Sequence, residues 1–79
     1  MIAMEIRYDT EADAMFIWFR ERGQHPYVRI IDDVRFLRMD DEGIAGVEFL
    51  DVSRGMNLDA IPHADEIREA LRCMAMPAA

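Results

Sequence analysis

The sequence is poor in cysteine, in basic residues and in long apolar runs, and each shortage excludes a class of protein. Cys73 is the only cysteine among the 79 residues, so the chain cannot form an internal disulfide. Neither His25 nor His63 stands at a spacing from Cys73 that is typical of zinc ligands, and we expect no metal and no cofactor. A small domain without disulfides or metals often gains stability by oligomerisation, so a homodimer is the expected state.

Positive charge is scarce as well. Nine arginines and no lysine face 16 acidic residues, which gives a formal net charge of −7 at pH 7. An acidic chain repels phosphate backbones, so we expect no nucleic-acid binding by this domain alone. No apolar run reaches transmembrane length and no basic segment leads into an apolar one at the N-terminus, so neither a membrane span nor a secretion signal is expected. A single unpaired cysteine then favours a reducing cytoplasm.

The sequence does contain strand patterns, followed by a helical pattern. Residues 4–8 alternate apolar and charged side chains, residues 15–19 are apolar on both faces, and β-prone runs cover 27–31, 34–39 and 44–52. From residue 61 onward apolar residues recur every three or four positions, which predicts one amphipathic helix: Ile61, Ala64, Ile67, Leu71 and Met74. We therefore predict a single two-layer α+β domain over residues 1–79. It comprises an antiparallel β-meander of four to five strands over about 4–52 and one C-terminal α-helix over about 62–75.

Two aspartates, Asp9 and Asp13, stand four residues apart between the first two predicted strands. An aspartate at the start of a tight connection can accept hydrogen bonds from backbone N–H groups two residues on, which forms an Asx-turn. A working carboxylate pair needs a cleft and separated pKa values, and a hairpin tip on a small domain offers no deep cleft. We interpret both residues as turn formers and assign no catalytic residue.

The aromatic residues Phe16 and Trp18 are predicted to lie on the sheet face opposite Met15 and Ile17. A helix of about a dozen residues is about 18 Å long, which is too short to cover both faces. Either arginine side chains cover the two rings through cation–π contacts, or the rings form a contact surface, most simply between two copies. We favour the contact surface. Glu48 is interpreted as the outward half of an alternating strand, paired across to an arginine rather than acting as a buried acid.

Two blocks of the sequence, IRYDTEADAMFIWF and DDVRFLRMDDEGIAGVEFLDVS, resemble the small prokaryotic family known as domain of unknown function 2283. The matching positions are Tyr8, Asp9, Ala12, Asp13 and Ala14 in the first block, and Asp40, Gly43, Gly46, Val47, Glu48, Phe49, Leu50 and Ser53 in the second. The spacing between Gly43 and Gly46 departs from the family pattern, so the strand register there stays open. Gly43 itself is predicted to supply the positive φ of a bulged hairpin.

The resemblance implies a small α+β sheet protein without an assigned activity, and for some members an antitoxin-like role beside small toxins. Two classes of function therefore remain open. The first is a non-enzymatic protein-interaction module, which acts as a homodimer or as the antitoxin-like partner of a small basic protein that the acidic surface would suit. The second is a ligand-binding or hydrolytic dimer with a carboxylate site at the subunit junction, built from Asp9, Asp13 or Glu48. An enzyme should show a concave pocket with converging carboxylates, and a binding module a flat apolar patch with an acidic rim.

Overall fold

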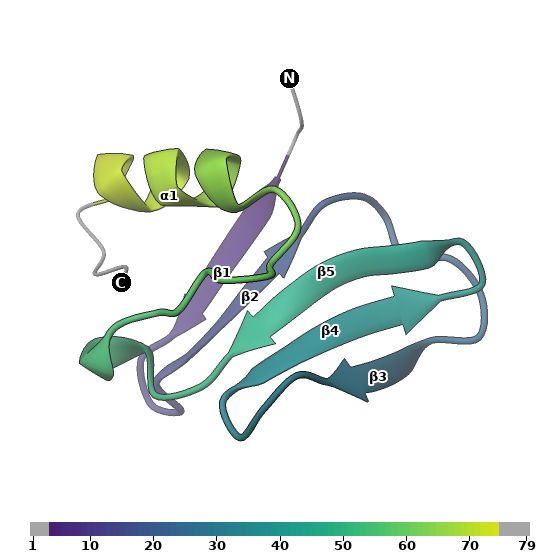
Figure 1. The fold of residues 1–79 in the computed structure, drawn as a ribbon, viewed down its shortest axis with the longest axis horizontal. Helices are drawn as coiled ribbons and strands as arrows, with labels where there is room; N and C mark the ends of the chain where they lie inside the picture. Colours follow the sequence, from purple (N-terminus) through teal and green to yellow (C-terminus); the bar gives the residue numbers. More distant parts are fainter. Residues whose placement is uncertain (1–3, 75–79) are drawn as a thin grey trace.

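The computed structural model describes residues 4–74, which form one antiparallel sheet with a helix on a single side (Figure 1). The α+β class, the five strands and the C-terminal helix confirm the sequence prediction. The helix begins two residues after Pro62, and its predicted end at residue 75 lies outside the described residues. The elements are β1 (Glu5–Asp9), β2 (Ala14–Trp18), β3 (Tyr27–Ile30), β4 (Arg35–Asp40), β5 (Gly43–Phe49), the short 3₁₀ helix η1 (Val52–Arg54) and α1 (Ala64–Cys73).

The strand order is β1-β2-β5-β4-β3, which departs from a strict meander at one place. β1 and β2 are neighbours, and so are β3, β4 and β5, but β2 pairs with β5 instead of β3. The chain therefore passes from β2 to the far edge of the sheet before it returns. This order puts the three strands with buried side chains in the centre, while β3, whose four residues are all exposed, stands at an edge. Burial of the apolar strands thus decides the order.

The β4–β5 hairpin settles the register that the sequence left open. Gly43 has φ 108°, as the sequence predicted, and pairs with Asp40 across a two-residue turn. Met39 then pairs with Ile44 and Arg38 with Gly46, so Ala45 is the extra residue of a β-bulge. The bulge places Gly46 directly opposite Trp18 of β2.

The core lies on one face of the sheet, which we call the inner face. Two parts of the chain cover it: α1, and the irregular segment 50–63, which crosses the sheet beside α1 (Figure 1). The sequence predicted the helical contribution but not the contribution of the irregular segment, and Ile61 precedes the helix to which its spacing assigned it. The buried side chains are Met15, Ile17, Phe19, Leu37, Met39, Val47 and Phe49 from the sheet and the residue after β2, Val52, Met56, Leu58 and Ile61 from segment 50–63, and Ile67 and Leu71 from α1.

A buried arginine fastens segment 50–63 to the sheet. Arg35, at the start of β4, donates from Nη1 to the carbonyl oxygen of Asp59 at 2.6 Å and from Nε to the carboxylate of Asp32 at 2.8 Å. A guanidinium group satisfies several acceptors from a fixed plane, so one side chain can hold both the turn before β4 and a loop more than twenty residues away. None of the helices in the described part of the chain is long and apolar enough to cross a membrane.

Candidate functional site

Three residues of the two sequence blocks meet at the end of the first hairpin. Asp13 has φ 52° and accepts hydrogen bonds from the Tyr8 hydroxyl at 2.8 Å, the Ser53 amide at 2.9 Å and the Ser53 hydroxyl at 2.6 Å. Its own carbonyl oxygen accepts from the amide of Val52 at 3.1 Å. Asp13 therefore joins the β1–β2 connection to η1 across 40 residues of sequence. The predicted Asx-turn at Asp13 is wrong, because its carboxylate accepts from Tyr8 before it and Ser53 far beyond it, and not from a backbone N–H two residues on.

These hydrogen bonds fix the protonation state of Asp13. The Ser53 hydroxyl, and after it the Tyr8 hydroxyl, stabilise the ionised carboxylate and lower the pKa of Asp13 below its usual range. The same contact raises the pKa of the Tyr8 hydroxyl, because losing that proton would place two negative groups together. A general acid or base works best with a pKa near the operating pH. Asp13 is instead held as an ionised, fully bonded anchor.

The other two candidate carboxylates are bonded elsewhere. Asp9 accepts from the amides of Glu11 at 3.0 Å and Ala12 at 3.2 Å, which is the Asx-turn that the sequence predicted. Glu48 accepts from Nη2 of Arg38 at 2.5 Å, so its predicted pairing across to an arginine is confirmed. Asp9, Asp13 and Glu48 share no bonding partner, and the structure does not bring them together into one site.

A fourth carboxylate, Asp40, is buried at the end of β4. Both its oxygens accept from Arg20 at 2.7 Å, and the amides of Gly23 and Glu42 donate to it at 2.6 and 2.8 Å. The hydrogen bonds from Arg20, with help from the Gly23 amide, hold the pKa of Asp40 far below its usual range. The pair fastens the β2–β3 connection to the sheet. Nothing local in the sequence indicated it, because Arg20 and Asp40 are twenty residues apart.

The face opposite the core carries Phe16 and Trp18, as the alternation predicted, and both rings are half-buried. The guanidinium carbon of Arg22 lies 4.9 Å from the centre of the Trp18 ring system, and that of Arg38 lies 5.7 Å from the centre of the Phe16 ring. Arginines therefore do cover part of each ring, as one of the two interpretations held. The cover is partial, so a contact surface is compatible with it.

Gly46 has a packing role beneath Trp18. A Cβ atom at this position would lie 2.5 Å from the backbone oxygen of Ile17 and 2.8 Å from Cε3 of the indole. Both distances are shorter than real Cβ contacts, so only glycine lets the indole pack this closely against β5. The sequence marked Gly46 through the family resemblance, and the structure supplies the reason for a glycine there.

The apolar surface continues to the sheet edge. Val28 and Ile30 of β3 stand opposite Arg38 and Phe36 of β4, on the same side as Trp18. Val28 is 44% exposed and Ile30 is 69% exposed, which makes them two of the most exposed large apolar side chains among the described residues. The sequence did not single these two out, although the alternation of Val28 and Ile30 around Arg29 in a β-prone run was the available signal. We call Phe16, Trp18, Val28, Ile30 and Phe36 together the outer face.

The residues just described lie in the part of the chain that matches a known family. A family described as "Protein of unknown function (DUF2283)" matches residues 5–53, which is more than half of the chain. The chain belongs to the DUF2283 family. No curated protein and no solved structure matches it. The DUF2283 match spans the entire sheet and ends at Ser53, the residue that bonds Asp13, while segment 54–63 and α1 lie beyond it.

Proposed function

We propose that this DUF2283 protein is a non-enzymatic interaction module that forms a homodimer through the outer face. The observation that supports the proposal is that the rest of the chain covers only one face of the sheet. Segment 50–63 and α1 both lie on the inner face (Figure 1), and no described segment covers Phe16, Trp18 or the exposed Val28 and Ile30. Contiguous exposed apolar side chains with a polar surround are typical of protein–protein contact sites.

The mixed local charges beside the outer face suit a second copy as its occupant, although the net charge of the chain does not. Two chains that each carry a net charge of −7 repel one another, so they should meet where negative charge is least. The alternation of β1, β2, β4 and β5 places two arginines, Arg7 and Arg38, and two glutamates, Glu5 and Glu48, beside the outer face, and Arg22 adds a third arginine. In a twofold contact an arginine of one copy can lie against a glutamate or an aromatic ring of the other.

The size of the sheet suits such a contact. Viewed down its shortest axis the molecule shows the sheet face-on, and it measures 33 by 29 Å in that plane (Figure 1). A standard interface buries about 800 Å² on each partner, which would occupy most of a face of these dimensions. A contact of standard size would therefore involve most of that side of the molecule.

Sedimentation equilibrium of variants tests the proposal. We expect the wild-type chain to sediment at twice its monomer mass, and both Ile30→Glu and Trp18→Glu to sediment as monomers, because each buries a carboxylate in the contact. Ile30 is mostly exposed in one chain, so its variant should fold normally. The matched control is Met74→Glu, which changes an exposed apolar residue at the end of α1 and should leave the dimer intact. A wild-type monomer, or dimers in both outer-face variants, would overturn the proposal.

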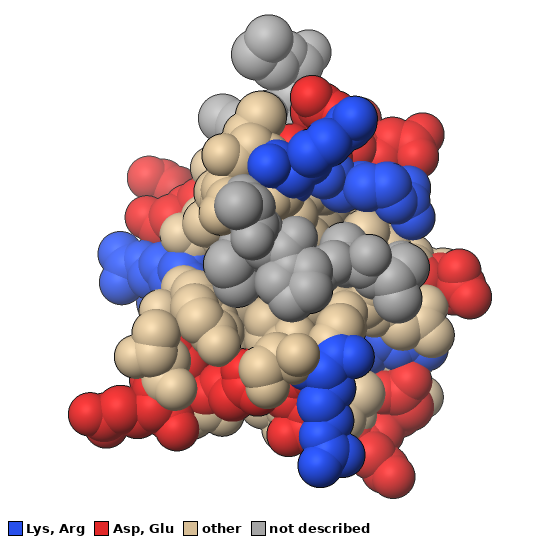
Figure 2. Space-filling view, turned by 90° about the vertical axis from the view of Figure 1, so that its left-hand side faces the viewer, with Lys and Arg blue, Asp and Glu red and all other residues tan. Residues whose placement is uncertain are grey.

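A small basic protein is a second proposed partner, and the acidic side chains away from the outer face support it. On the side of the molecule that holds η1 and the end of α1, acidic groups stand around the rim with arginines between them (Figure 2). Such a surface would attract a basic protein over long range and leave the outer face for the second copy. Salt-sensitive co-elution with the basic product of a neighbouring reading frame would support this antitoxin-like role. We propose the cytoplasm as the location, which suits the exposed free Cys73.

The carboxylate-site alternative receives less support from the geometry. Asp9 caps a turn, Asp13 holds η1, and Glu48 pairs with Arg38, so each acid already has hydrogen-bond donors of its own. Moving any of them to a shared site would break those bonds. A dimer that hydrolysed a substrate with loss of activity in Glu48→Gln would restore this alternative.

A further inference from the structure

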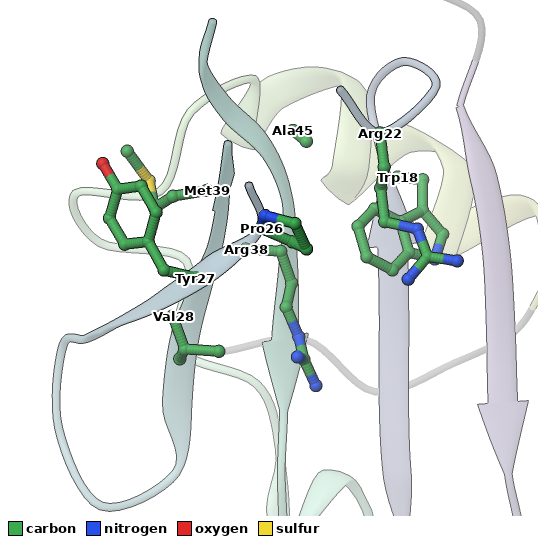
Figure 3. Close-up of a pocket in the computed structure, with 8 residues that line it drawn as sticks. All are labelled: Trp18, Arg22, Pro26, Tyr27, Val28, Arg38, Met39 and Ala45. Atoms are coloured by element: carbon green, nitrogen blue, oxygen red, sulfur yellow. The ribbon is translucent and has the colours of Figure 1, made fainter. Parts of the chain in front are cut away.

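A small pocket opens at the β3 side of the outer face. Its volume is about 230 Å³, and its walls come from the end of β2, the β2–β3 connection and strands β3 to β5. Trp18 and Arg22 stand on one side, Tyr27, Val28 and Met39 on the other, with Arg38 and Pro26 between them (Figure 3). A single chain supplies every one of these residues.

The two arginines have unused hydrogen-bonding capacity. Arg22 lies over the indole of Trp18 and makes no ion pair or side-chain hydrogen bond with any residue in the range 4–74. Arg38 donates only from Nη2, to Glu48, and its Nε is the one buried side-chain polar atom without a partner in that range. The two guanidinium groups are the only charged groups among the described residues that line the pocket, although the chain as a whole is strongly acidic.

The remaining walls are apolar and flat. The indole of Trp18, the ring of Pro26 and the side chain of Val28 offer stacking and van der Waals contact but almost no hydrogen-bonding groups. Pockets for drug-sized ligands measure roughly 300–1,000 Å³, so this pocket suits a smaller molecule. A flat apolar body with one anionic end matches both the walls and the arginines.

We propose that this pocket binds a small aromatic carboxylate. The ring of the ligand packs among Trp18, Pro26 and Val28, and its carboxylate accepts paired hydrogen bonds from the guanidinium of Arg22, with Arg38 beside it. The site has the opposite charge from the carboxylate site that the sequence left open, and none of Asp9, Asp13 and Glu48 lines it. One chain forms it, but Trp18 and Val28 also belong to the outer face, so the pocket is open only while that face is not covered by a second copy.

Titration with benzoate tests the proposal, because Trp18 is the only tryptophan and lines the pocket. We expect saturable quenching of its fluorescence and a saturable shift of its indole N–H resonance in the NMR spectrum. Benzamide, which keeps the ring without the charge, and acetate, which keeps the charge without the ring, should each bind at least about tenfold more weakly.

Arg22→Gln should weaken benzoate binding at least about tenfold, since it removes the charge-assisted contact. The matched control is Arg54→Gln: Arg54 is exposed in η1 and lies outside the pocket, so this variant should bind as the wild type does. The resonance shift keeps the readout valid if Arg22→Gln alters the starting fluorescence. An absence of saturation, equal affinity for benzamide, or wild-type affinity in Arg22→Gln would overturn the proposal.

Trp18 and Val28 belong both to the pocket and to the outer face, so a homodimer through that face would cover the pocket. The titrations, with and without the arginine substitutions, are therefore made in the Ile30→Glu chain, whose changed residue does not line the pocket and which is expected to be a monomer. An Ile30→Glu monomer that fails to bind benzoate overturns the pocket and leaves the interface standing. A wild-type chain that sediments as a monomer and binds benzoate overturns the interface and leaves the pocket standing.

Discussion

Ser53 donates two hydrogen bonds to Asp13, one from its amide and one from its hydroxyl, and Tyr8 donates a third. These bonds close the DUF2283 region by joining its first hairpin to its last turn. At the scale of single residues, Asp13 is an anchor, as are Asp40 for the β2–β3 connection and Asp32 for the turn before β4.

The contribution of each donor to Asp13 can be measured through its pKa. In Ser53→Ala the hydroxyl donor is lost while the amide donor remains, so the pKa of Asp13 should rise toward its usual value. Tyr8→Phe should raise it less, because the serine hydroxyl is the larger cause of the lowered pKa. Carboxyl ¹³C chemical shifts followed against pH report both changes. A larger rise in Tyr8→Phe than in Ser53→Ala would contradict this ranking.

At the scale of elements, the irregular segment 50–63 does the work of a second helix. It brings Val52, Met56, Leu58 and Ile61 onto the inner face, and Arg35 fixes it through backbone carbonyl groups. The central strands β2, β4 and β5 are therefore covered on the inner face although α1 has only ten residues. No element within residues 4–74 covers the outer face, and arginines lie over its aromatic rings instead.

Met56→Ala tests the role of this segment. The side chain of Met56 is 1% exposed, and its removal should lower the free energy of unfolding by about 2–5 kcal/mol, through lost burial and the cavity left behind. The matched control is Met74→Ala, at a methionine that is 46% exposed, which should change it by less than about 0.5 kcal/mol. Urea denaturation followed by Trp18 fluorescence measures both. Equal, small effects would show that the segment does not belong to the core.

At the scale of the whole molecule, three aspartates with lowered pKa values tie stability to pH. Hydrogen bonds to Asp13, Asp32 and Asp40 favour the ionised form in the folded chain. An aspartate in the unfolded chain has a pKa of about 3.9. Each contribution is therefore complete above about pH 4 and is lost as pH falls below that value, because the unfolded chain then takes up protons first.

Asp40→Asn should make the molecule less sensitive to acid. The urea midpoint of the wild type should fall between pH 5 and pH 3, and that of the variant should fall by less, because the most strongly shifted of the three carboxyl groups has been removed. If the variant is too unstable to measure, Arg20→Gln serves instead. It keeps the carboxylate and its backbone donors but removes the largest cause of the lowered pKa. A variant with the same pH dependence as the wild type would contradict this account.

The sequence alone determined the α+β class, an antiparallel sheet of four to five strands, the helix from about residue 62 and the opposite orientation of Met15 and Trp18. These features follow from side-chain periodicity, which is local information. It also determined the turn roles of Asp9 and Gly43, since an Asx-turn and a positive φ depend on a few neighbouring residues.

Only the tertiary structure decided the pairing of β2 with β5, the partners of Asp13 and Asp40, the burial of Met56 and the meeting of Arg22, Arg38 and Trp18 around one pocket. Each of these joins residues many positions apart, and periodicity carries no signal about which distant segments meet. The choice is made by the demand that apolar strands be buried and that buried polar groups find partners, a demand that the chain satisfies only as a whole.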